Sequence, residues 1–201
     1  MRISAVCCLV SVGIALAGSL ARPVAADSPR RQLGAHEHGK ATLAIAIEGA
    51  RVELALESPA DDIVGFEHAP ATDAEKAAVA KARKQLGEGG QLFRLTPAAG
   101  CKLQSADVTP TGAMTAKKPG GKDAHGHGKD AHSHGGEAHA EFHAGYVFMC
   151  GKPENLKGLS FPFFKAYPHL RALHVTVIGP KGQTAFEVTP ATPDLTLAGV
   201  I

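Results

Sequence analysis

The residues with the clearest chemical potential in this chain are its eleven histidines. Eight of them form two sets, one inside a segment rich in Gly, Lys and Asp, the other at the edges of segments that should be ordered. The first set is His125, His127, His132 and His134, and the second is His36, His38, His139 and His143. Imidazole is the commonest protein ligand for zinc and also suits copper and nickel. The spacing, mostly His-x-His, predicts metal binding, with zinc ahead of other divalent transition metals.

A stronger pattern than the pair His36 and His38 is the alternation of His139, Glu141 and His143 along one predicted strand. Alternate residues of a strand point to the same side, so these three potential ligands share one face. The opposite face is apolar and consists of Phe142, Tyr146, Phe148 and Cys150. Structural zinc sites usually have four ligands, and open sites have three plus water. His36 and His38 could complete this site if the first strand lies beside this one; the alternative is the polar outer face of an edge strand.

The four histidines between 125 and 134 lie in a stretch from about 109 to 137 dominated by Gly, Lys, Pro, Asp and His. Such a composition cannot bury enough apolar surface to order itself, so we expect a disordered insertion between two strands. A disordered loop loses conformational entropy when it binds, which predicts weak capture of several metal ions there. A plain polar linker is the alternative for this stretch, and a solvated tail is the alternative for the histidines at 36 and 38.

The remaining histidines carry weaker signals. His68 precedes a predicted helix start, where a packed or capping role competes with metal binding. His169 and His174 have apolar sequence neighbours and are predicted to be structural. The acidic pair Asp61 and Asp62 is predicted to end a strand rather than to perform acid–base chemistry. Because the sequence contains no nucleophile elbow, phosphate-binding loop or helical two-histidine zincin motif, it does not indicate an enzyme.

The first 26 residues have the composition of a secretory signal peptide. Arg2 is followed by a stretch of apolar and small residues, and Ala26 ends a small-residue cleavage pattern. Cleavage would remove Arg2 and Arg22, which account for the formal net charge of +2, and would leave residues 27–201 formally neutral. A neutral chain lacks the basic field that nucleic-acid binding requires. We therefore expect an exported protein with no nucleic-acid partner and no membrane attachment after cleavage.

Two cysteines, Cys101 and Cys150, remain after cleavage. Exported proteins enter an oxidising compartment, so we expect these two to form a disulfide, with two buried thiols as the alternative. The bond would tie together the two ends of the segment that contains the His-rich insertion. Loop-entropy reasoning gives it roughly 3–4 kcal/mol of stabilisation.

We expect one α+β domain over 27–201, in which antiparallel β-hairpins pack with one or two helices and the disordered His-rich insertion interrupts them. Thr72 and Glu75 form a capping-box pattern, which predicts a helix over about 73–86. Alternating apolar residues predict hairpins at 42–57 and 173–188 and further strands at 91–95, 101–108 and 138–150, and residues 161–167 could form a short helix.

Several of these segments together resemble a known family. The string HEHGKA occupies 36–41, SPADDIVGFEHAP occupies 58–70, and a Tyr146-x-Phe-x-Cys strand follows the His-rich insertion. This arrangement, over most of 27–201, is similar to the ZrgA-type periplasmic zinc-binding proteins. The resemblance implies a periplasmic protein that binds zinc and assists its uptake, with a zinc ABC importer or its binding protein as recipient. It also implies functional roles for Glu67 and His68, which lie in its most specific string.

Two other classes of function remain open at this stage. A metal-dependent hydrolase would need an open metal position and a general base in a pocket, and the face formed by His139, Glu141 and His143 could supply the first of these. A structural periplasmic domain would instead carry a His-rich loop that only buffers metal.

Overall fold

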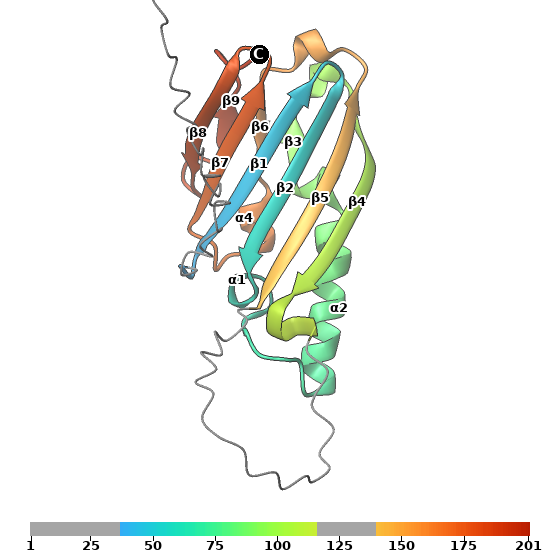
Figure 1. Cartoon of the computed structure of the whole chain (residues 1–201), viewed down its shortest axis with the longest axis vertical. Helices are drawn as coiled ribbons and strands as arrows, with labels where there is room; N and C mark the ends of the chain where they lie inside the picture. Colours follow the sequence, from blue (N-terminus) through green and yellow to red (C-terminus); the bar gives the residue numbers. More distant parts are fainter. Residues whose placement is uncertain (1–36, 116–139) are drawn as a thin grey trace, which may run out of the picture. The chain divides into compact units, whose positions relative to one another are not determined.

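The computed structural model describes residues 37–115 and 140–201, whose strands form two sheets (Figure 1). The larger sheet has six strands in the order β4-β5-β2-β1-β7-β8, and the smaller one has three in the order β3-β6-β9. Together with the helices they form the predicted α+β fold. The predicted signal peptide, His36, the four loop histidines, His139 and the rest of 116–139 lie outside the described residues.

The elements have the following bounds. The larger sheet contains β1 (Lys40–Glu48), β2 (Arg51–Pro59), β4 (Cys101–Thr111), β5 (Glu141–Cys150), β7 (Ala172–Gly179) and β8 (Gly182–Val188). The smaller sheet contains β3 (Arg94–Leu95), β6 (Gly158–Ser160) and β9 (Asp194–Thr196). The α-helices are α1 (Ala60–Val64), α2 (Asp73–Gly87), α3 (Gly89–Leu92) and α4 (Phe163–Ala166), and the 3-10 helices are η1 (Pro97–Ala99), η2 (Gly112–Thr115) and η3 (Pro153–Asn155).

The hairpin of β1 and β2 shows why the larger sheet has one covered face. Leu43 and Ile45 are buried, whereas Thr42 and Ala44 between and beside them are exposed. This alternation is the two-residue period of a strand with one face on the core. Gly49 allows the tight turn because its φ is +55°. The first predicted hairpin is therefore confirmed, as is the second, formed by β7 and β8.

The larger sheet is mixed, whereas the sequence pattern predicted antiparallel hairpins. The two hairpins join through β1 and β7, which run parallel with Ala44 opposite Thr176. A parallel pair needs a long crossover connection, and the chain between β1 and β7 contains most of the other elements. The smaller sheet was not predicted, because its strands are only two or three residues long and show no readable period.

Several predicted boundaries also need correction. In the segment 91–95, residues 91 and 92 end α3, and only Arg94–Leu95 is a strand. The predicted insertion from 109 starts too early, because β4 continues to Thr111 by pairing with β5 and η2 extends to Thr115. Residues 58 and 59 remain in β2, so the strand breaks at Ala60.

The predicted helix at 73–86 is confirmed as α2, with its capping box. The backbone N–H of Glu75 donates to Thr72 Oγ1 (3.2 Å), and the Thr72 backbone N–H donates to Glu75 Oε2 (2.9 Å). These bonds satisfy amides that have no partner inside the helix. The predicted short helix around 161–167 is found as α4.

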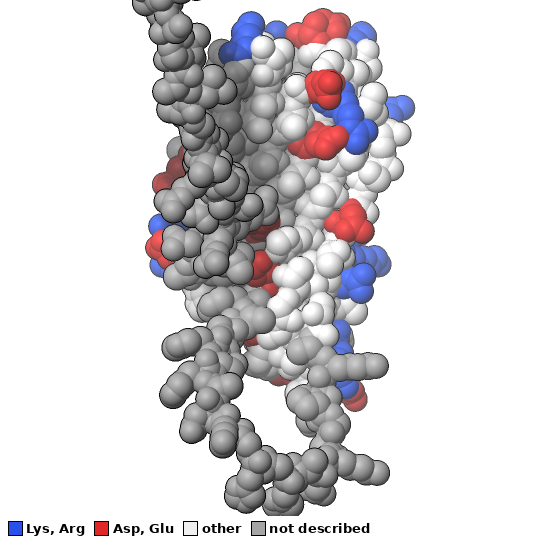
Figure 2. Space-filling model, viewed as in Figure 1, with Lys and Arg blue, Asp and Glu red and all other residues white. Residues whose placement is uncertain are grey.

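The core lies between the covered face of the larger sheet and the remaining elements. Phe93 is its centre, with ring centroids 5.2 Å from Tyr146, 6.1 Å from Phe161 and 5.5 Å from Phe163. The opposite face of the larger sheet carries exposed side chains such as Thr42 and Ala44, and the visible part of it shows charged residues scattered among uncharged ones (Figure 2). In the described part of the chain, no helix is both long and apolar enough to cross a membrane.

The predicted disulfide between Cys101 and Cys150 is present. The two residues lie directly opposite each other where β4 begins and β5 ends. The bond therefore closes the loop that contains 116–139, and it does so at the far end of these strands from Glu141 and His143.

Candidate metal-binding site

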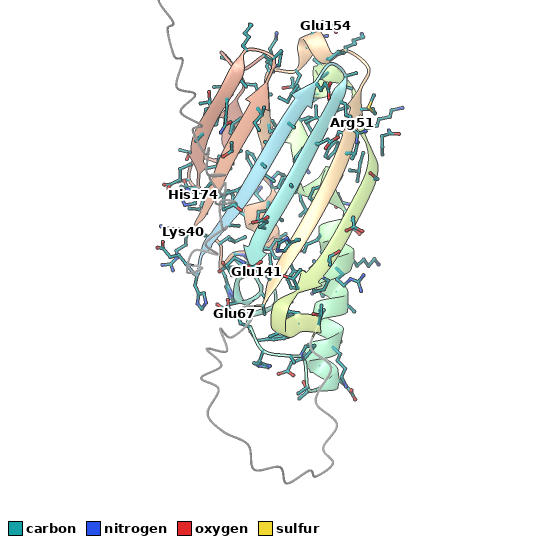
Figure 3. The ribbon with its side chains drawn as sticks, in the orientation of Figure 1. Lys40, Arg51, Glu67, Glu141, Glu154 and His174 are labelled. Atoms are coloured by element: carbon teal, nitrogen blue, oxygen red, sulfur yellow. A yellow bond between two sulfur atoms is a disulfide. The ribbon has the colours of Figure 1, made fainter. Side chains whose placement is uncertain are left out.

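Several strand ends bring the chemically active side chains to one end of the larger sheet. Because β2 is antiparallel to both β1 and β5, the start of β1, the end of β2 and the start of β5 lie together. We call this region, formed by residues 37–39, 57–68 and 140–143, the histidine end. Glu67 and Glu141 lie there, and Arg51 and Glu154 lie toward the opposite end of the sheet (Figure 3).

His38, which lies directly before β1, is close to the carboxylate of Glu67, which follows α1. His38 Nε2 lies 3.2 Å from Glu67 Oε1. Glu67 Oε1 is buried, yet within the described residues it takes part in no hydrogen bond, and its contact with His38 is an ion pair only when the imidazole is protonated. A buried carboxylate oxygen without a hydrogen bond costs free energy, which marks this position as one that a ligand would satisfy.

The distance between these two atoms suits a shared zinc ion. Zinc lies about 2.0–2.2 Å from nitrogen and oxygen ligands, so two such ligands at the tetrahedral angle are about 3.4 Å apart. The observed 3.2 Å is close to that separation. His38 and Glu67 therefore have both the chemistry and the spacing of two zinc ligands.

The second nitrogen of His38 also faces a carboxylate. His38 Nδ1 is 3.7 Å from Asp61 Oδ2, a residue of α1. Metal-binding histidines commonly direct their other ring nitrogen toward a carboxylate, which selects the tautomer and orients the ring. The 3.7 Å distance is too long for a direct hydrogen bond, so Asp61 acts here through its charge.

Asp62, the neighbour of Asp61, faces inward instead. Its side chain is buried, and its two carboxylate oxygens lie 2.8 and 3.0 Å from the backbone nitrogen of Gly39, which donates to them. Burial raises the pKa of the Asp62 carboxyl group above its usual value, while the Gly39 hydrogen bond opposes that shift. Asp61 and Asp62 were predicted to end a strand, and α1, which contains them, does follow β2. The sequence did not predict that each of their carboxylates also contacts the segment around His38.

The start of β5 carries a second histidine–carboxylate group. His143 Nε2 lies 2.7 Å from Glu141 Oε2, and His143 Nδ1 lies 3.9 Å from Glu57 Oε1 on β2. Glu57 is paired with His143 in the strand register. Glu141 and His143 share one side of β5 as predicted, while Phe142 on the other side is buried in the core.

The two histidine–carboxylate groups do not share one strand pair. β2 lies between β1 and β5, so the first strand is not beside the strand of His143 as the shared-site prediction required. Among residues 37–115 and 140–201, no group of three His, Cys, Asp or Glu side chains could hold a metal ion. Within these residues neither group therefore forms a complete coordination shell, and the 2.7 Å contact of His143 with Glu141 is a hydrogen bond, shorter than the separation of two ligands on one zinc ion.

His68 has contacts other than those of the two pairs. Its ring stacks on Phe66 with centroids 4.9 Å apart, Nδ1 lies 3.1 Å from the carbonyl oxygen of Ala69, and Nε2 lies 3.7 Å from Glu75 Oε1 at the start of α2. This geometry agrees with the packed or capping role that the sequence left open. Within residues 37–115 and 140–201 the carboxylate beside its ring is that of Glu75 at 3.7 Å, against 3.2 Å for Glu67 beside His38, and the metal role of His68 stays a prediction.

His169 and His174 were predicted to be structural residues with apolar neighbours, and this prediction of their surroundings was wrong. Both side chains are exposed, and His174 Nδ1 lies 3.8 Å from Glu187 Oε2 on the open face of the sheet. For His174 the apolar sequence neighbours were misleading because alternate residues of a strand face opposite sides, whereas His169 lies in the turn before β7. Glu57 and Asp61 were missed as neighbours of histidines for the related reason that their contacts depend on strand pairing and on the path of α1.

The fold and the histidine end define an α+β protein that gathers histidines and carboxylates at one end of a mixed sheet. Residues 35–197 match the family model described as ZrgA family zinc uptake protein. This match covers most of the chain, so the protein belongs to the ZrgA family of zinc uptake proteins. No curated protein matches the sequence.

Proposed function

We propose that this protein captures zinc in the periplasm and passes it to an uptake system, with no enzymatic turnover. The family membership supports zinc uptake as the general role. The observation that carries the proposal for this chain is the pair formed by His38 Nε2 and the buried, unbonded Glu67 Oε1 at 3.2 Å. A pair of this kind gains a partner for Glu67 when a divalent cation binds.

In this proposal zinc binds more tightly at the histidine end than at the loop histidines. His38 and Glu67 supply two ligands, and His143 supplies another from β5, with Glu141 orienting its ring through their hydrogen bond. The predicted ligands His36 and His139 are adjacent in sequence to these groups and would raise the ligand number. The loop histidines at 125, 127, 132 and 134 would collect further ions with lower affinity, because ordering that segment costs conformational entropy.

A hydrolase receives less support from the arrangement of the surface. Depressions of about 360 Å³ on the open face of the larger sheet and about 680 Å³ beside the smaller sheet are lined by neither of the histidine–carboxylate pairs. A metal-dependent hydrolase needs a substrate pocket next to the metal. Reversible capture of an ion needs only exposed ligands, and the His38 side chain is 57% exposed.

Calorimetric titration of zinc into the protein from residue 27 onward tests the proposal. We expect a tight step that is lost or weakened at least tenfold in a His38→Ala/Glu67→Gln variant, since two of its ligands are gone. His174→Ala is the matched control, because it removes an exposed histidine paired with a carboxylate on another part of the sheet. Equal effects of both variants would contradict a site at His38.

Deletion of residues 120–137 separates the two kinds of binding. The tight step should survive this deletion, whereas weaker steps should disappear. Delivery is tested by transfer of zinc from the loaded protein to the purified binding protein of a zinc importer. Export is tested by the N-terminus of the protein recovered from periplasm, which should be Asp27.

A further inference from the structure

We propose that Asp62 is a positioning residue for His38, because its buried carboxylate holds the backbone turn that presents the imidazole. This inference rests on the proposed function of His38 as a zinc ligand. The two carboxylate oxygens of Asp62 accept the Gly39 backbone N–H at 2.8 and 3.0 Å. Only 4% of Asp62 is exposed, so water does not compete for this bond.

The other side of the same turn is held by the segment that leads into β7. The Gly39 carbonyl oxygen accepts the backbone N–H groups of Arg171 (2.8 Å) and Ala172 (3.0 Å). The Arg171 guanidinium also donates to the His38 carbonyl oxygen at 3.3 Å. Both peptide groups around Gly39 are thus bonded to segments distant in sequence.

Gly39 itself is adapted to this close packing. Its φ of +85° lies in the left-handed region, which favours glycine. A Cβ atom at this position would lie 2.6 Å from Arg171 Nε. The turn therefore has little freedom, and the direction in which His38 leaves the backbone is set by its contacts with Asp62 and Arg171.

The contact with Asp62 links this turn to the other groups of the histidine end. Asp62 and Asp61 are consecutive residues of α1, so the helix that bonds Gly39 also places the Asp61 carboxylate 3.7 Å from His38 Nδ1. The chain then turns after α1, where Gly65 adopts a φ of +83°, and brings Glu67 to His38 Nε2. Asp62 thereby ties the segment of His38 to α1. The same helix carries Asp61 and is followed by Glu67, the two carboxylates beside His38.

Burying a carboxylate costs free energy unless its hydrogen bonds compensate, and the contact that uses both oxygens is with a single backbone amide. An alanine at this position would avoid that cost but would leave the Gly39 amide without its partner. A buried carboxylate whose two oxygens both bond to the Gly39 amide is better explained by a role of Asp62 in ordering the turn than by a role in filling the core.

The test compares Asp62→Ala with Asp62→Asn by zinc calorimetry. Asparagine keeps an oxygen acceptor for the Gly39 amide and nearly the same volume, whereas alanine keeps neither. We expect Asp62→Ala to weaken the His38-dependent zinc step by roughly 10- to 100-fold, as seen when groups that orient metal ligands are lost, and Asp62→Asn to retain most of the affinity. Asp194→Ala, which removes an exposed carboxylate from the smaller sheet, should leave the affinity unchanged.

A double-mutant cycle separates positioning from general stability. In a His38→Ala background, Asp62→Ala should cause no further loss of zinc affinity, because its effect acts through His38. An equal loss in both backgrounds would overturn the proposal, as would unchanged affinity in Asp62→Ala. Loss of equal size in Asp62→Asn would assign the effect to the charge of the carboxylate instead of the held turn, and would also overturn it.

NMR of the zinc-free protein tests the turn directly. Hydrogen exchange at the Gly39 amide should be slow in the wild type and in Asp62→Asn, and the His38 ring resonances of these two proteins should coincide. If Asp62→Ala does not fold, Asp62→Asn and Arg171→Ala give the answer: the first should preserve the His38 resonances and the second should shift them. Fast Gly39 exchange in the wild type would overturn the proposal. Absence of a His38-dependent zinc step with slow Gly39 exchange would contradict the proposed zinc site alone.

Discussion

The backbone N–H of Ala60, the first residue of α1, donates to the carbonyl oxygen of Ala140 at 2.9 Å. Ala140 directly precedes Glu141, so α1 is bonded to the segment that begins β5. Through Asp62 the same helix is bonded to Gly39, beside His38. Five residues of helix thus connect the two histidine–carboxylate groups, although β2 separates their strands.

Glu141 and Glu57, the two carboxylates beside His143, should affect zinc affinity to different extents. Glu141→Gln should weaken the His143-dependent part of zinc binding about tenfold or more, because it removes the carboxylate 2.7 Å from His143 Nε2. Glu57→Gln should have a smaller effect, since Glu57 lies 3.9 Å from Nδ1. Calorimetry on both variants measures the difference. Glu187→Gln, whose carboxylate lies 3.8 Å from His174 Nδ1, is the control, and a similar loss there would refute the assignment.

Zinc binding should depend on pH because only the deprotonated imidazole can ligate a metal. Lowering the pH from about 7.5 to about 5 should reduce zinc affinity and increase the number of protons released per zinc. Calorimetry in buffers with different ionisation enthalpies measures both quantities. Affinity that stays constant across this range would rule out histidine ligation.

The disulfide should contribute stability without affecting the zinc site. Cys101 and Cys150 are separated by 49 residues, for which loop entropy gives about 4 kcal/mol. A Cys101→Ser/Cys150→Ser variant should lose free energy of unfolding of that order in chemical denaturation. Its His38-dependent zinc affinity should be unchanged while it is folded, because the bond lies at the far end of β5 from Glu141 and His143. A large loss of affinity in the folded variant would argue against this separation.

The capping box of α2 predicts a pH effect on stability. Hydrogen bonds from the Thr72 and Ala71 backbone amides lower the pKa of Glu75 below its usual 4.5. A carboxylate with a lowered pKa stabilises the folded state above its unfolded pKa, and this contribution is lost as the pH falls through the folded pKa. Glu75→Gln should therefore be less stable than the wild type at pH about 7, and the difference should vanish in acid.

Denaturation curves at several pH values measure this difference. Glu48→Gln, at the exposed end of β1, is the control for loss of a surface carboxylate. A difference between wild type and Glu75→Gln that persisted unchanged in acid would show that the charge of Glu75 does not stabilise the helix start.

The sequence by itself determined the features that depend on local order. The period of two residues in β1 and β2, the capping box at Thr72 and Glu75, and the two faces of β5 are set by neighbouring residues and were predicted correctly. The disulfide also followed from the sequence, because only two of the cysteines lie outside the predicted signal peptide. The family strings around His38 and Glu67 likewise pointed to the segments that meet at the histidine end.

Only the tertiary structure decided which side chains meet. The parallel pairing of β1 with β7, the position of β2 between β1 and β5, and the contact of Asp62 with Gly39 join residues that are far apart in sequence. Such contacts depend on strand order and register, which arise from packing of the whole core and leave no local period to read. For that reason the sequence identified the histidines, whereas the folded chain determined that His38 faces Glu67 and that His143 faces Glu141 and Glu57.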